Sequence, residues 1–154
     1  NKVANTTFQG VVRSYGGGSK GTHTPGVMTQ SVQISFDPTQ SSATNVRIGT
    51  SATSGETLTL PAGAIPISLA VLGGATGGTN PTVDIGTSAD PDGLFNEVDA
   101  DTTGGDIVGA GGALAVAGGL VADATVTGMK GSSAATGGTF TGILTYAMSN
   151  DGVE

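Results

Sequence analysis

Six pairs of adjacent glycines interrupt the chain between residues 73 and 138, and the segments between them are short. Glycine makes up 28 of the 154 residues. Because glycine inside a helix costs about 1 kcal/mol relative to alanine, long helices are disfavoured. In many of the remaining segments, Val, Ile and Leu alternate with Thr and Ser, which is typical of half-buried strands. The sequence therefore predicts an all-β chain of short strands, with turns at the glycine pairs.

The strand pattern is densest between residues 57 and 94. Residues 57–60 alternate as a half-buried strand, and Pro61 with Gly63 predicts a corner. Residues 65–72 follow as a strongly apolar strand, and Pro66 predicts that this strand lies at an edge or carries a bulge. Residues 82–86 form the next strand. The predicted bulky face of the 65–72 strand consists of Ile65, Ile67, Leu69 and Val71.

Residues 27–37 show the strictest period of two, with Met28, Gln30, Val32, Ile34 and Phe36 on one side. A helix over residues 108–121 is possible by length, but the five glycines there favour strands. Residues 124–129 and 138–147 are predicted to pair across a turn. With about eight strands in the body, we expect an antiparallel, jelly-roll-like β-sandwich. The remaining predicted strands are residues 43–48, 106–108, 113–116 and 119–129.

Three regions are expected along the chain. Residues 1–26 read as an extended N-terminal arm that ends in a glycine-rich linker, because a long segment of this composition is uncommon inside a compact domain. Residues 27–148 form the sandwich, and residues 149–154 form a polar tail. The alternative for the first region is that residues 3–13 are the first strand of the body and the glycine-rich stretch is a long loop.

Composition excludes several classes of function. The chain has no cysteine and one histidine, His23, so Cys-based zinc sites, thiol nucleophiles and most histidine-cluster metal sites are excluded. With a net charge of −7 and five basic residues, the chain is not expected to bind nucleic acid. No apolar run approaches the length of a membrane-spanning helix, so no membrane partner is expected. No cofactor is expected.

Acidic residues concentrate between positions 84 and 106. Asp90, Asp92, Asp99 and Asp101 are the candidate ligands for a calcium ion, since clustered carboxylates bind hard cations. Their spacing does not fit the helix–loop–helix calcium template, and Asp-Pro-Asp-Gly is also an ordinary turn sequence, so a solvated acidic loop is favoured. A glycosidase pair is disfavoured because the chain has no tryptophan and few other aromatic residues. We therefore expect no enzymatic activity and no catalytic residue.

Three motifs resemble a group of small, β-rich virion proteins of tailed bacteriophages, which includes capsid decoration (cement) proteins and head fibre or knob components. The motifs are residues 59–66 (TLPAGAIP), 84–95 (DIGTSADPDGLF) and 138–146 (GTFTGILTY). The resemblance covers about residues 28–147. It implies a jelly-roll-like domain, self-association as a homotrimer, and binding to the major capsid protein on the outer surface of the virion. These motifs are structural corners.

The arm lies outside this resemblance, and its residues predict a second contact. An extended segment can add a strand to an exposed sheet edge of a neighbour, with alternate side chains giving specificity. Its basic residues would then meet an acidic capsid surface. The candidate partner-binding residues are Lys2, Val3, Phe8, Val11, Arg13 and Lys20.

Two other functions remain open from the sequence. A head fibre, knob or tail adsorption protein would bind a host surface, with residues 89–105 as the expected binding loop. A carbohydrate-binding or surface-layer module would need aromatic platforms or a calcium site, and the sequence offers little of either. Capsid decoration is favoured over a fibre because no heptad repeat predicts a stalk.

Overall fold

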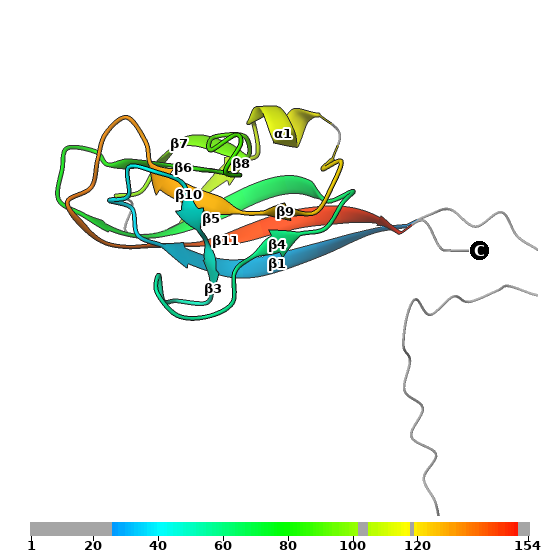
Figure 1. The fold of residues 1–154 in the computed structure, drawn as a ribbon, viewed down its shortest axis with the longest axis horizontal. Coiled ribbons are helices and arrows are strands. Elements are labelled where there is room, and N and C mark those ends of the chain that lie inside the picture. Colours follow the sequence, from blue (N-terminus) through cyan, green and yellow to red (C-terminus); the bar gives the residue numbers. More distant parts are fainter. Residues whose placement is uncertain (1–25, 102–104, 118, 151–154) are drawn as a thin grey trace, which may run out of the picture.

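The computed structural model describes residues 26–101, 105–117 and 119–150, which form an antiparallel β-sandwich with one short helix (Figure 1). This confirms the predicted all-β class. The five-stranded sheet has the order β3 (Arg47–Ile48), β1 (Gly26–Phe36), β11 (Gly137–Asn150), β5 (Ile65–Thr76) and β8 (Asp106–Gly109). The four-stranded sheet has the order β2 (Thr44–Asn45), β10 (Thr127–Lys130), β6 (Thr82–Gly86) and β7 (Phe95–Asp99). β4 (Thr59–Leu60) pairs with β9 (Ala124–Thr125), and α1 spans Ala113–Val116.

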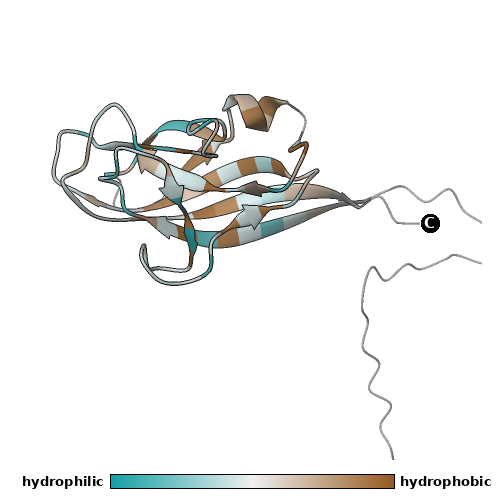
Figure 2. Ribbon diagram, in the orientation of Figure 1, coloured by the Kyte–Doolittle hydropathy of each residue, from teal (hydrophilic) through white to brown (hydrophobic). Residues whose placement is uncertain are grey.

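Three long strands, β1, β11 and β5, form the centre of the five-stranded sheet. β1 pairs with β11 without interruption from Gly26↔Asn150 to Phe36↔Phe140. Ile34 and Phe36 are buried, as the period of two predicts, whereas Met28 is 60% exposed. Figure 2 shows the resulting bands of hydrophobic and hydrophilic residues along these strands.

The core lies between the two larger sheets. The five-stranded sheet contributes Phe36 and Phe140, whose ring centroids are 5.0 Å apart at an interplanar angle of 40°. The four-stranded sheet contributes Ile85 and Phe95, both almost completely buried. The three phenylalanines that the structure describes are therefore all core residues.

β5 confirms the bulge predicted from Pro66 but changes its expected face. The pairing with β11 shifts register between Ser68↔Thr145 and Pro66↔Tyr146, so Ile67 is an extra residue on β5. A one-residue insertion moves the side chains beyond it to the opposite face. Leu69 is buried as predicted, but Ile65 and Ile67 are 37% and 43% exposed. The strand is internal, since β8 pairs with its other side.

The predicted strand at residues 113–116 is wrong, because this segment forms the single turn of α1. The segment lies between glycines, so none of them is placed inside the helix, and its four residues, ALAV, include the good helix formers Ala and Leu. In the part of the chain that the structure describes, no helix has the length and apolar character needed to cross a membrane.

Backbone hydrogen bonds join the three sheets around Val46, Leu58 and Val126. The amide of Val46 donates to Val126 (3.0 Å), that of Val126 to Leu58 (2.9 Å), and that of Leu58 to Val46 (3.1 Å). All three side chains are buried. The predicted strand at residues 43–48 is thus divided at Val46 into β2 and β3, which belong to different sheets.

The predicted pairing of residues 124–129 with residues 138–147 is also wrong. β10 pairs with β2 and β6 in one sheet, whereas β11 pairs with β1 and β5 in the other. The turn between them therefore connects the two layers of the sandwich instead of closing a hairpin. Most of the predicted 119–129 strand is replaced by β9 and β10, which begin at Ala124 and Thr127.

Candidate interaction site

The six candidate partner-binding residues of the N-terminal arm lie outside the described residues. Their role therefore stays a prediction. They are Lys2, Val3, Phe8, Val11, Arg13 and Lys20.

The four aspartates considered for calcium do not form one group. Asp90 and Asp92 lie in the loop before β7, whereas Asp99 is the last residue of that strand and Asp101 follows it. They are thus separated by the length of β7, and the amide of Asp101 donates to Asp99 Oδ1 at 3.0 Å. Among the described residues, no group of three or more acidic or histidine side chains is arranged to hold a metal ion.

Carboxylates do come close to one another around the start of β7. Partial burial raises the pKa of Asp84, and the negative charges of Glu97 and Asp92 raise it further. Asp90 also has a raised pKa, because of desolvation and because Asp92 lies beside it. In this region the carboxylates therefore oppose one another's ionisation.

Glu97 links three segments of the four-stranded sheet region. It lies in a β7 bulge opposite Asp84, with φ of 52°, and its amide donates to Asp84 Oδ1 at 2.8 Å. Its carboxylate accepts hydrogen bonds from the Thr82 hydroxyl and from the amide and hydroxyl of Ser132. The bond from Thr82, followed by those from Ser132, lowers the pKa of Glu97.

We predict that Glu97→Gln lowers the free energy of unfolding at pH 7 by about 1 kcal/mol, because exposed charge-assisted hydrogen bonds are replaced by neutral ones. A lowered folded-state pKa stabilises the fold above the unfolded value, near 4.5, and this contribution is lost as pH falls through the folded value. The difference between wild type and variant in urea unfolding should therefore be constant at neutral pH and shrink below pH 4.5.

Glu56→Gln is the matched control, since Glu56 is exposed and lies outside this network. A Glu97→Gln difference that persists unchanged at the lowest pH would contradict a role for the ionised carboxylate.

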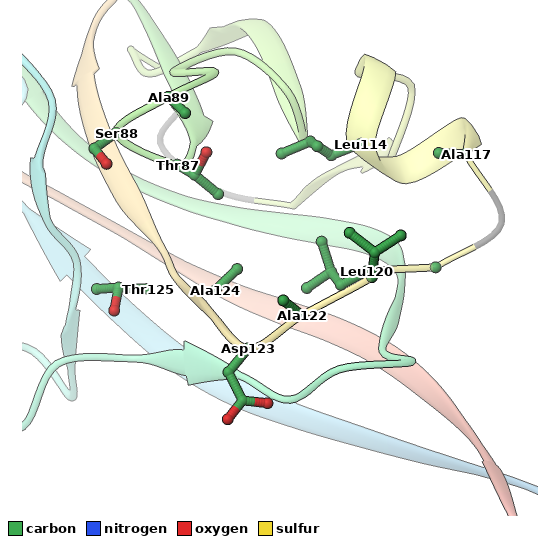
Figure 3. Close-up of a pocket in the computed structure, with 12 residues that line it drawn as sticks. Thr87, Ser88, Ala89, Leu114, Ala117, Leu120, Ala122, Asp123, Ala124 and Thr125 are labelled. Carbon is green, nitrogen blue, oxygen red and sulfur yellow. The ribbon is translucent and has the colours of Figure 1, made fainter.

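A pocket of about 520 Å³ lies between α1, the loop at residues 87–89 and the segment at residues 119–125 (Figure 3). Leu114 and Leu120 line its apolar part, and Asp123 is also a lining residue, although its carboxylate points away from these two side chains. Val121, another lining residue, is 100% exposed, and Val116 on the neighbouring helix is 72% exposed. The sequence signal for this pocket was the presence of two isolated valines, Val116 and Val121, in a Gly/Ala-rich segment. Their spacing does not predict that they lie beside residues 87–89.

The outer face of the five-stranded sheet carries a second apolar feature. Cross-strand pairing aligns Gln33, Ile143, Ala70 and Ile107 in one row. Ile107, on the edge strand β8, is 75% exposed.

Both features offer packing surfaces. The lining residues include the hydroxyl side chains of Thr87, Ser88 and Thr125 and one carboxylate, that of Asp123. The Asp123 carboxylate already accepts a hydrogen bond from the amide of Ala62 at 2.9 Å. An apolar contact flanked by a charge is what this arrangement can provide.

Comparisons with known proteins find a structural relative only. No family model matches the sequence, and no match to a curated protein was found. A chain in the capsid asymmetric unit of cyanophage Pam1 is similar in structure, with a TM-score of 0.50 and 16% sequence identity. The match covers 94% of this chain and 98% of that chain, so the two chains have similar lengths and share a fold over nearly their whole extent.

Proposed function

We propose that this chain is a bacteriophage capsid decoration, or cement, protein that binds the outer surface of the major capsid protein lattice and stabilises the shell. The observation that carries the proposal is the fold shared, along almost the full length of both chains, with a component of a cyanophage capsid. The phage-like motifs at residues 59–66, 84–95 and 138–146 point to the same class.

The physical role follows from the properties of a lattice. A protein that bridges neighbouring capsid subunits adds contact area at many equivalent places, so each copy needs only modest affinity. No catalytic chemistry is required. We expect the protein to self-associate as a homotrimer, which light scattering coupled to size-exclusion chromatography would measure.

In this proposal, the N-terminal arm contributes to capsid attachment. All twelve acidic residues lie at position 37 or later, whereas Lys2, Arg13 and Lys20 are three of the five basic residues. A basic segment on an acidic body can approach an acidic capsid surface that would repel the body itself.

The test is cosedimentation of the purified protein with empty shells of the major capsid protein, with the copies per shell quantified. Saturation at a fixed ratio to capsid subunits is expected. A variant lacking residues 1–20 should stay folded, as judged by cooperative unfolding, and should no longer bind shells.

Either of two results would overturn parts of this proposal. Absence of binding, or only a few copies per particle, would favour a head fibre, knob or tail adsorption protein, and a screen of glycans and host cells would follow. Retained shell binding by the truncated protein would remove the arm from the contact.

A further inference from the structure

We propose that the pocket between α1, the loop at residues 87–89 and residues 119–125 is a binding site for residues 8–13 of the same chain. This inference concerns the free protein and goes beyond the proposed capsid role. The segment has the sequence FQGVVR, which combines apolar side chains with a cation.

The size and lining of the pocket suit an apolar segment. Its volume of about 520 Å³ lies in the range of sites that enclose small ligands. Leu114, Leu120 and Val121 provide the apolar contact surface. Burying the exposed Val121 against Phe8, Val11 or Val12 would remove apolar area from water on both partners, which favours association.

The charges of the two partners are complementary. Residues 1–25 contain three basic and no acidic residues, whereas residues 26–154 contain two basic and twelve acidic residues, a net charge of −10. Asp90 lies next to the pocket: a Cβ added at Gly93 would be 2.6 Å from Asp90 Oδ2 and 2.7 Å from Cδ1 of the lining residue Leu114. Arg13 would therefore meet the Asp90 carboxylate beside the pocket.

The point where the arm joins the body is close enough to the pocket. Thr29, three residues after the start of β1, pairs with Ala147 of β11, and Ala147 pairs with Ile65 of β5. Ile65 in turn lies against Gly119, which lines the pocket. Three residues along a strand and two strand spacings place the start of β1 roughly 15 Å from Ile65. The thirteen residues from Arg13 to Gly26 span up to about 45 Å when extended, so the segment reaches its own pocket. A tethered segment also acts at a high effective concentration, which favours it over the arm of a second copy.

The experiment uses the full chain with Phe8→Trp, which introduces the only tryptophan. We expect a blue-shifted emission and weak quenching by acrylamide, independent of protein concentration. Adding Val121→Asp should shift the emission to the red and raise quenching several-fold. Val121 is completely exposed, so this change leaves the core intact. Arg13→Gln should have the same direction of effect, and added salt should weaken the contact.

Ile107→Asp is the matched control, because Ile107 is also highly exposed but lies on the outer face of the five-stranded sheet. This substitution should leave the tryptophan emission unchanged. A solvent-like tryptophan emission that Val121→Asp does not alter would overturn the inference. If only Ile107→Asp abolished the blue shift, the segment would lie on the outer face of the five-stranded sheet. If the blue shift grew with protein concentration, the segment would bind the pocket of a second copy. Each of these results would also overturn the inference. Because no shell is present, each result is independent of the cosedimentation test.

Discussion

Phe140→Ala should lower the free energy of unfolding by about 3–5 kcal/mol, the largest loss we expect from a single truncation in this chain. Phe140 is fully buried in the middle of the core and contacts the ring of Phe36. The opposite sheet closes this space tightly, because a Cβ added at Gly128 would lie 2.7 Å from carbon atoms of the Phe36 ring. The surrounding backbone therefore has little freedom to collapse into the cavity, which keeps the cost high.

Urea unfolding of the wild type and the variant measures this loss as a change in midpoint at constant slope. Phe140→Leu, which retains most of the apolar volume, should lose distinctly less. Ile107→Ala is the surface control and should change stability by no more than about 0.5 kcal/mol. A loss below about 1.5 kcal/mol for Phe140→Ala would mean that the core around Phe36 repacks.

The local pattern of the sequence was sufficient to predict the strands whose two faces differ most. β1 alternates strictly, and Ile34 and Phe36 on its predicted face are buried, although Ser35 on the other face is buried as well. The turn after β1 was also predictable, because Asp37 accepts hydrogen bonds from the Thr39 amide (2.9 Å) and hydroxyl (2.7 Å), as Asp before Pro suggests.

Sequence reasoning failed where distant segments decide the structure. The face of β5 reverses at Ile67 because of its register with β11, and residues 43–48 change sheets at Val46 because Val126 accepts the hydrogen bond of its amide. The candidate pocket depends on the approach of residues 87–89 to residues 119–125, which no local pattern encodes. The separation of Asp92 from Asp99, by contrast, follows directly once β7 is placed between them.

The glycine pairs give the most instructive difference. They were expected to mark turns, but Gly73 and Gly74 lie inside β5, and Gly137 and Gly138 are the first two residues of β11. The pairing of these two strands shifts register between Gly138 and Thr141, so the glycines accommodate an irregular, close crossing of two long strands.

Gly74→Ala should therefore lower the free energy of unfolding by roughly 3 kcal/mol or more, which combines backbone strain with steric overlap. Gly74 has φ of 110°, and an added Cβ would collide with the backbone carbonyl oxygen of Thr139, which no side-chain rotation can relieve. Gly49 provides a matched control, because its φ of 107° is nearly the same but no atom lies within 4 Å of an added Cβ. Gly49→Ala should cost only about 1 kcal/mol, the part due to φ alone. The difference between the two variants in urea unfolding then measures how closely β5 and β11 approach. Equal losses would show that the strands separate readily at this point, and that glycine is required there only for its positive φ.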